Sequence, residues 1–383
     1  MFRYLTAGES HGPALVGILD GLPAHIPLDA ERVNAVLAAR QGGHGRGNRM
    51  KIESDAVEFL GGVRGSRTLG SPVAVMIRNR DFENNKLLMD PITGSGQPLT
   101  NPRPGHADYA GAMKYRHRDL RNVLERASAR ETAMRVALGA ICGQFLELLG
   151  ITTLSYVTAI GAISAREANY TRTESIEDSP VRCPDANATA AMMEAIDAAK
   201  AAGDTLGGSF MLRVVGLPAG IGSNRQPDTR LDGILAAALM GTQTVKVVEV
   251  GDAAGAPAGS QAHDTFATAD GNITRGSNRA GGIEGGMSNG QPVALRVGVK
   301  PIPTLRKALP SVNLHEGVSA PASLVRSDVC VVPAASLVCE AMVRLALVGP
   351  VLEKYGGDSL EETQDNLRRS REAAARLFDK IPG

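Results

Sequence analysis

The chemistry that this sequence could carry is concentrated in a basic stretch over residues 101–135. The stretch has eight lysines and arginines against four acidic residues, a net charge of +4, whereas the 383-residue chain has a net charge of +1. Residues 128–131 (SARE) match a capping box, so a helix is expected to begin there. Arg126 and Arg130 would then lie at the positive end of a helix dipole, which is unfavourable for cations. A bound anion would offset this repulsion. An anion site and a solvated basic surface both fit this stretch.

Two histidines lie in turns that could present them to a ligand. His11 belongs to GESHG (residues 8–12) and His106 to RPGHAD (residues 103–108), and histidine is the side chain best suited to proton transfer near neutral pH. GESHG matches the G-x-S-x-G elbow of hydrolases, but an elbow follows several strands and precedes a helix. Here only seven residues precede it and Pro13 opens a strand-like run. We expect Ser10 and His11 to project from a tight turn; a buried structural histidine is the alternative.

A second basic segment, residues 40–51, contains Arg40, Arg46, Arg49 and Lys51 and no acidic residue. Its glycines allow the backbone to approach a ligand closely, which favours an anion-binding loop over a flexible surface loop. Far along the chain, Asp328 lies two residues after an arginine and could be a charged carboxylate base, although an ordinary salt bridge would look the same.

Several classes of protein are disfavoured by composition and spacing. The chain has no Gly-Lys dipeptide for a P-loop, no G-x-G-x-x-G between a strand and a helix, and no histidine pair at zinc spacing. Near-zero net charge, no Trp, six Tyr and seven Phe argue against a nucleic-acid platform. The four cysteines form no metal-like or redox-like pair and are expected to be reduced core thiols. Without a leader or an apolar run of membrane length, a soluble cytoplasmic protein is expected.

The hydrophobic pattern predicts an α+β fold. Strands are expected at residues 2–7, 13–20, 55–62, 72–79, 151–163, 207–216, 293–299 and 323–331. Helices are expected at 29–40, after 106, from 128 to Gly150, and at 188–202, 230–240, 334–348 and 359–379, with a long loop at 80–105. Strands and helices do not alternate strictly, so a doubly wound parallel sheet is not favoured. These elements would bring the arginines together in a cytosolic enzyme for a small polyanion, with histidines as acid–base groups.

Six segments of the chain resemble the signature segments of the chorismate synthase family. In chain order they are GESHG (8–12), RQGGHGRGNRMKIESD (40–55), RPGHADYAGAMKYRHRDLRNVLERASARET (103–132), GGIEGGMSNGQP (281–292), KPIPTL (300–305) and RSD (326–328). The resemblance implies one domain over residues 1–383, folded as a β-α-β sandwich with antiparallel sheets enclosing long helices. It also implies a homotetramer.

The resemblance further implies a 1,4-anti elimination of phosphate from 5-enolpyruvylshikimate 3-phosphate to give chorismate, in the shikimate pathway of aromatic amino acid biosynthesis. The family reaction uses reduced FMN without net redox change. Two alternatives are a flavin-dependent oxidoreductase acting on a small polyanion, which would consume NADPH stoichiometrically, and an RNA-binding protein. No nucleic acid or membrane partner is expected, and a separate flavin reductase is, because the chain shows no dinucleotide domain.

The family's site residues transfer to matching positions of this chain. The substrate clamp is expected at Ser10, Arg40, Arg46, Arg49, Arg103, Arg130 and Arg326. The flavin cradle is expected at Arg126, Ala127, Ser128, Gln243, Thr244, Gly285, Lys300, Pro301, Ile302, Pro303, Thr304 and Arg326. By resemblance, His11 lies beside the leaving phosphate, His106 faces the pyrimidine edge of the flavin, and Asp328 is the base that relays a proton from flavin N5.

Two features of the match are unusual. Residues 242–247 (TQTVKV) depart from the family pattern Ser-Ile-x-Ala-x-Lys-Gly, so Gln243 and Thr244 are assigned by position alone. The family's NADPH site falls on Arg40 and Arg46, which equally suit the substrate, so NADPH is expected only as an indirect reductant.

Overall fold

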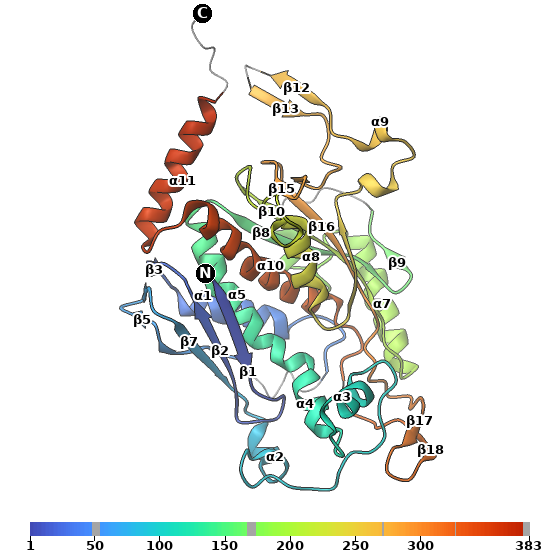
Figure 1. Cartoon of the computed structure of the whole chain (residues 1–383). Helices are drawn as coiled ribbons and strands as arrows, with labels where there is room; N and C mark the ends of the chain where they lie inside the picture. Colours follow the sequence, from blue (N-terminus) through green and yellow to red (C-terminus); the bar gives the residue numbers. More distant parts are fainter. Residues whose placement is uncertain (48–53, 167–173, 270–271, 326, 378–383) are drawn as a thin grey trace, which may run out of the picture.

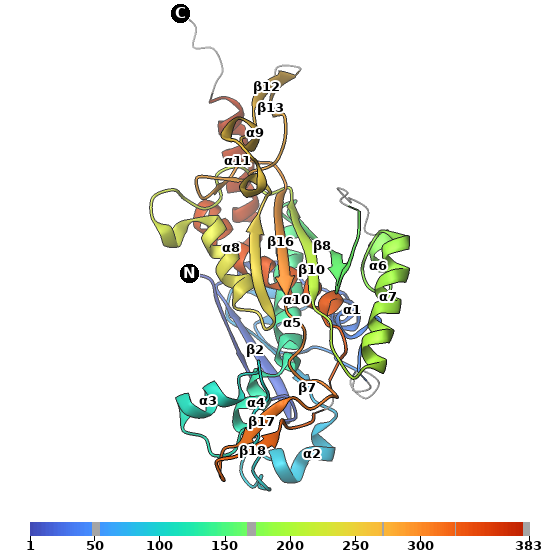
Figure 2. The same cartoon turned by 90° about the vertical axis from the view of Figure 1, so that its right-hand side faces the viewer.

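The computed structural model describes residues 1–47, 54–166, 174–269, 272–325 and 327–377. Two expected site residues, Arg49 and Arg326, lie outside these ranges. Within them, two antiparallel sheets lie on either side of a layer of long helices (Figure 1). The predicted α+β sandwich is therefore confirmed. Figure 2, which is turned by 90°, shows one of the two sheets facing the viewer, with smaller elements below it and a hairpin projecting above.

The first sheet has the strand order β1 (Arg3–Ala7), β2 (Ala14–Asp20), β7 (Val73–Arg78) and β4 (Glu58–Gly61). Its two central strands, β2 and β7, alternate between buried and more exposed side chains, because one face of the sheet packs on a helix. The packing is close at Gly17, where a Cβ atom would lie 2.5 Å from the sulfur of Met134. All neighbouring strands in this sheet are antiparallel.

The second sheet has the order β11 (Val245–Val250), β16 (Val293–Val299), β10 (Gly208–Val215), β8 (Thr152–Ile160) and β9 (Ile163–Ser164). β16 alternates without exception between buried valines or leucine and half-exposed residues, as period-two patterning predicts. The chain leaves the end of β16 at Lys300, whose backbone N–H donates to the carbonyl of Thr244 just before β11.

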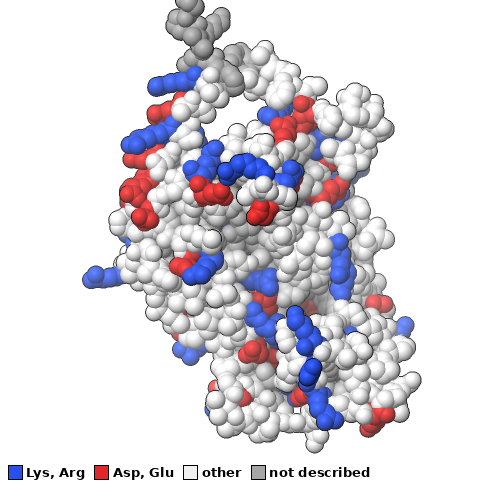
Figure 3. Space-filling model, in the orientation of Figure 1, with Lys and Arg blue, Asp and Glu red and all other residues white. Residues whose placement is uncertain are grey.

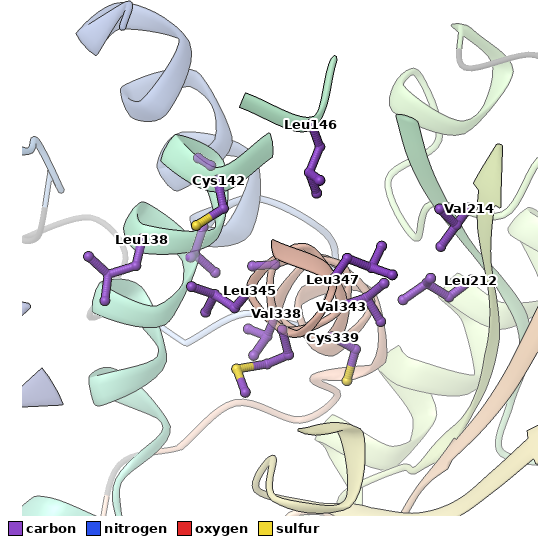
Figure 4. Packing of buried hydrophobic residues seen from close by; sticks show 14 of the residues in the cluster. Leu138, Cys142, Leu146, Leu212, Val214, Val338, Cys339, Val343, Leu345 and Leu347 are labelled. Atoms are coloured by element: carbon purple, nitrogen blue, oxygen red, sulfur yellow. The ribbon is translucent and has the colours of Figure 1, made fainter. Parts of the chain in front are cut away.

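Helices α1 (Ala30–Gln41), α5 (Thr132–Glu147) and α10 (Val332–Tyr355) fill the space between the sheets. Figure 4 shows α10 end-on, with α5 on one side and the second sheet on the other. The expectation that no apolar run reaches membrane length was wrong, because α10 is long and apolar enough to cross a membrane by length and composition. However, 72% of its apolar window is buried inside the protein. The helix is the centre of the hydrophobic core.

Smaller elements surround this sandwich. They are β3 (Ala24–Pro27), β5 (Val63–Arg64), β6 (Arg67–Leu69), α2 (Phe82–Met89), α3 (Asp108–Tyr115), α4 (Arg121–Ala127), the 3-10 turn η2 (Ala129–Glu131), α6 (Glu174–Glu177), α7 (Ala186–Ala201), η3 (Pro227–Thr229), α8 (Leu231–Met240), η4 (Ala253–Gly255), α9 (Gly259–Ala262), β12 (Phe266–Ala269), β13 (Asn272–Arg275), β14 (Ile283–Glu284), β15 (Met287–Ser288), β17 (Pro310–Asn313), β18 (Val318–Pro321) and α11 (Leu360–Ala375).

Three expectations about local structure were wrong. The loop at 80–105 contains α2, and the described residues of 323–331 form no strand, because their backbone bonds to scattered loops, as in Val329 N to Gly45 O at 2.9 Å. The capping box is also absent. The tight turn η2 makes Ser128 Oγ accept from Arg130 N, and Glu131 bonds Gln243 and Arg135 instead.

Candidate active site

Three arginines predicted to bind an anion form one cluster, which we call the arginine cluster: Arg40, Arg46 and Arg130. Arg40, at the end of α1, donates to Thr132 Oγ1 and to the carbonyl of Ala129. Burial, together with the nearby charge of Arg46, lowers the pKa of Arg40 to about 9. Arg40 Nη1 is buried and has no hydrogen-bond acceptor among the described residues. An anionic oxygen would satisfy this donor.

Two aspartates partly neutralise the arginine cluster. Arg130 Nη1 lies 2.6 and 2.7 Å from the two carboxylate oxygens of Asp55, and this pair is almost wholly buried. Arg46 Nη1 donates to Asp328 Oδ2 at 2.7 Å, while the backbone N–H of Gly47 donates to Oδ1 at 2.6 Å. Among the described residues, Arg130 and Arg46 each face one of these carboxylates and Arg40 pairs with neither, so one positive charge is in excess there, in a region of low dielectric. Such an excess favours an anionic ligand.

The GESHG turn lies beside the arginine cluster. Asn79 connects the two: its Nδ2 donates to the carbonyls of Glu9 and Gly12, and its Oδ1 accepts from Arg130 Nε at 2.9 Å. Ser10 is buried in the turn. The single amide of Asn79 therefore fixes the position of His11 relative to the arginines.

His11 lies between two carboxylates. Its Nδ1 lies 3.0 Å from both oxygens of Glu125, and its backbone N–H donates to the same carboxylate at 2.8 Å. Its Nε2 lies 3.8 Å from Asp81 Oδ2. With Nδ1 engaged by Glu125, Nε2 is the ring nitrogen left to contact a ligand, next to Asp81. This geometry suits a proton donor.

His106 belongs to a buried ion cluster with Arg103 and Asp108. His106 Nδ1 lies 2.5 Å from Asp108 Oδ1, and Arg103 donates to both oxygens of the same carboxylate. Burial alone would raise the pKa of Asp108, but hydrogen bonds from His106 and Arg103 outweigh it and hold this pKa well below its usual range. The remaining guanidinium nitrogen, Arg103 Nη1, donates to Thr304 Oγ1 at 2.8 Å.

The KPIPT segment joins the His106 group to the arginine cluster. Lys300 Nζ donates to the carbonyl of Gly105, next to His106, at 2.5 Å. At the other end of the segment, Thr304 lines the same pocket as Asp328, the partner of Arg46. Pro301, Ile302 and Pro303 lie between, with the Ile302 carbonyl held by Thr205 Oγ1 at 2.8 Å. Residues separated by more than 280 positions therefore line one region.

Most of the expected flavin cradle is also assembled here. Arg126 donates to the carbonyls of Thr6 and Gly8, so Ala127 and Ser128 lie beside the GESHG turn. Gln243 donates to Glu131 at 2.6 Å, and the Thr244 carbonyl accepts from Lys300 N at 3.0 Å. Gln243 Oε1 is buried without a hydrogen-bond donor among the described residues.

The polar groups and cations of this cradle fit a flavin. The unsatisfied oxygen of Gln243 would accept from an N–H or O–H of the ring or side chain, and nearby cations suit a phosphate. Gly285 is the exception: it lies in the β14–β15 hairpin, which packs at the Val293 end of β16. Lys300 follows the opposite end of this seven-residue strand, roughly 20 Å away. Gly285 is therefore not brought to the site within this chain.

Four residues of the site were not predicted from the sequence: Asp55, Asn79, Asp81 and Glu125. Asp55 and Glu125 lie within signature segments, and Asp55 ends the acid-poor basic loop, so their positions were a usable signal. Asn79 and Asp81 lie in a segment that matched no motif. Outside the site, Figure 3 shows positive side chains along the lower part of one face, where α3 lies in Figure 1; Lys114, Arg116 and Arg118 are exposed there.

A buried arginine cluster with excess charge, flanked by two carboxylate-bound histidines, is the arrangement of an enzyme that acts on a small polyanion. The comparisons identify which enzymes. A family model described as "Chorismate synthase" matches residues 2–352. The chain belongs to the chorismate synthase family.

Individual relatives support this assignment over the whole chain. A chorismate synthase of Desulforudis audaxviator is 52% identical, covering 96% of this chain and 97% of the relative. One of Symbiobacterium thermophilum is 50% identical over 98% of this chain and all of the relative. A solved structure titled "Crystal Structure of Chorismate Synthase" superposes with a TM-score of 0.79 at 38% identity, covering 98% of this chain and 99% of that one.

Proposed function

We propose that this enzyme is a lyase of the shikimate pathway that eliminates phosphate from 5-enolpyruvylshikimate 3-phosphate in a 1,4-anti sense, giving chorismate. Membership of the chorismate synthase family supports the activity. The single structural observation that carries it is the arginine cluster, whose net positive charge is enclosed between the His11 turn and the His106 group.

The arginine cluster is proposed to grip the substrate. The substrate has two carboxylates and a phosphate, and guanidinium groups bind such oxygens through paired hydrogen bonds. Arg40, Arg46 and Arg130 supply these donors, with Ser10 from the adjacent turn and Arg103 from the His106 group. Arg49 and Arg326 join the clamp by their positions in the family's segments. The cation excess would draw the substrate in and hold it away from water.

His11 is proposed to donate a proton from Nε2 to the departing phosphate. The C–O bond to phosphate breaks with its electrons on oxygen, so negative charge grows there and an imidazolium stabilises it. Glu125 holds Nδ1 and so keeps Nε2 directed at the phosphate. Asp81 Oδ2 lies 3.8 Å from Nε2 on the other side of the ring.

The cofactor is proposed to be FMN in its reduced form, bound by the cradle residues. Reduced flavin supplies electron density to the allylic system, with no net redox change. His106, held by Asp108, is proposed to place a positive charge at the pyrimidine edge of the ring. Asp328, paired with Arg46, is proposed to be the base that relays the proton from the N5 position of the flavin, at a carboxylate oxygen.

The remaining assignments rest on the family resemblance. We propose a single domain, a cytoplasmic homotetramer, and a separate flavin reductase that keeps FMN reduced. NADPH is proposed to act only indirectly, because the two arginines at its expected position, Arg40 and Arg46, are assigned to the substrate.

An anaerobic assay tests the proposal. Purified protein, 5-enolpyruvylshikimate 3-phosphate and chemically reduced FMN should release one phosphate per chorismate, with the flavin still reduced at the end. Release of phosphate only with stoichiometric NADPH consumption would favour an oxidoreductase instead. No release under either condition would refute the activity.

A further inference from the structure

The segment that leads from α8 into β11 is strained. Thr244 has a φ of +72°, a left-handed conformation that is unusual for a β-branched residue. The pairing of β11 with β16 shifts immediately afterwards: Val245 opposes Val299 and Val247 opposes Gly298, which leaves Lys246 as an extra, unpaired residue. Such bulges redirect a side chain, and both bulges and strained backbones are concentrated at functional sites.

The bulge presents Lys246 beside the cofactor cradle. Lys246 is exposed, and the residue two before it, Thr244, accepts a hydrogen bond from Lys300 N at 3.0 Å. Partial burial and the positive charge of Lys246 lower the pKa of Lys300. Neither lysine forms an ion pair with any residue in the described part of the chain, whereas Arg40, Arg46 and Arg130 lie close to carboxylates. Two adjacent ammonium groups without a counter-ion favour a doubly charged anion.

We propose that Lys246 is a cofactor-binding residue, and that Lys246 and Lys300 together bind the phosphate monoester of the flavin. This inference rests on the proposed function, in which the cradle holds FMN. A phosphate monoester carries close to two negative charges at neutral pH, which matches two lysines. The strained Thr244 and the bulge then have a role, since they set the backbone position of Lys246 beside the start of the KPIPT segment. The pair selects FMN over riboflavin, which lacks the phosphate.

Equilibrium dialysis of chemically reduced FMN and reduced riboflavin under anaerobic conditions, with the bound flavin measured by its fluorescence after reoxidation, tests this role in the intact protein. Lys246→Met keeps the aliphatic stem and removes the charge. It should weaken FMN binding by about tenfold or more, as expected for loss of a hydrogen bond between charged groups, and leave riboflavin binding unchanged. Lys246→Arg should recover most of the FMN affinity. Lys354→Met, which removes an exposed lysine near the far end of α10, is the matched control and should change neither affinity.

The outcomes separate this inference from the proposed function. If wild-type protein binds neither flavin, the proposed cofactor itself is refuted. If wild-type protein binds FMN but Lys246→Met lowers both affinities equally, or lowers neither, the phosphate role of Lys246 is refuted and the cofactor assignment stands. A salt titration adds a second readout, because the preference for FMN over riboflavin should decline with ionic strength in wild type more than in Lys246→Met.

Discussion

His11 Nδ1 lies 3.0 Å from both carboxylate oxygens of Glu125, although the two residues are 114 positions apart. Glu125→Gln keeps the shape of the side chain but removes the carboxylate that holds the His11 ring. We expect kcat to fall by at least about tenfold, less than for removal of His11 itself, with little change in substrate KM. Steady-state kinetics measure both constants, and Glu58→Gln, in an exposed pair with Arg78, should leave both unchanged. An unaltered kcat in Glu125→Gln would contradict the role of Glu125.

Asp55 should be needed for stability as well as for the site. Asp55→Asn leaves Arg130 buried with its charge uncompensated by that carboxylate, which costs about 3–5 kcal/mol. Urea unfolding measures the change. Asp365→Asn, in an exposed pair with Arg368, should cost less than about 1 kcal/mol. A similar loss of unfolding free energy in both variants would show that the buried pair stabilises the fold no more than the exposed pair does.

Arg40 should make anion binding depend on pH. The guanidinium binds an anion only when it is protonated, so affinity should be constant below about 9, the pKa to which burial and Arg46 lower it, and should fall as the pH rises through this value. Binding of the substrate to wild-type protein between pH 7 and 10.5 measures this. Arg40→Gln should bind more weakly with a flatter profile over the same range. A profile in Arg40→Gln as steep as in wild type would assign the titration to another group.

Asp108 should stabilise the fold in a pH-dependent manner. Its pKa is depressed in the folded protein by His106 and Arg103, so its contribution is complete above the ordinary value of about 4 and is lost as the pH falls toward the folded value. The difference in unfolding free energy between wild type and Asp108→Asn should therefore shrink below about pH 4. A difference that stays constant from pH 7 to pH 3 would mean that the lost stability comes from packing alone.

Two helical glycines should respond oppositely to alanine. At Gly139 in α5, a Cβ atom would lie 2.5–2.6 Å from atoms of Ala341 in α10, so Gly139→Ala should destabilise by about 1–3 kcal/mol. At Gly349 in α10, a Cβ atom meets nothing within 4 Å, so Gly349→Ala should stabilise by about 0.5–1 kcal/mol. Thermal unfolding of both variants tests the pair. Equal shifts would show that the α5–α10 contact is not tight.

Local patterns predicted much of the fold. β16 begins and ends where alternation placed it, at Val293 and Val299, and α8 begins within one residue of its expected start. The strand expected at 323–331 failed because apolar residues in an extended loop resemble a strand when their backbone partners are unknown. α10 was predicted too short because its apolar face continues past Pro350, whose position inside a helix suggests an earlier end.

The cationic residues of the site could be predicted from the sequence, but the acidic residues that pair with them could not. Arginines and glycines form local runs, so residues 40–51 and 101–135 were recognisable from the sequence. The acids that balance them come from elsewhere: Asp55 is 75 residues from Arg130, and Asp328 is 282 residues from Arg46. Their pairing depends on how the sheets bring loops together, which no local pattern encodes. Arg130 accordingly was expected at an anion-binding helix end, whereas it lies in a 3-10 turn against a carboxylate.

The four cysteines have a practical consequence for anyone handling the enzyme. All are free and buried, and burial raises the pKa of Cys330 to about 11 and of Cys339 to about 12. A thiol reacts with alkylating reagents as its thiolate, so none of them should be labelled at neutral pH while the chain is folded. The rate of labelling in dilute urea would then report how often the whole molecule opens, without any engineered probe.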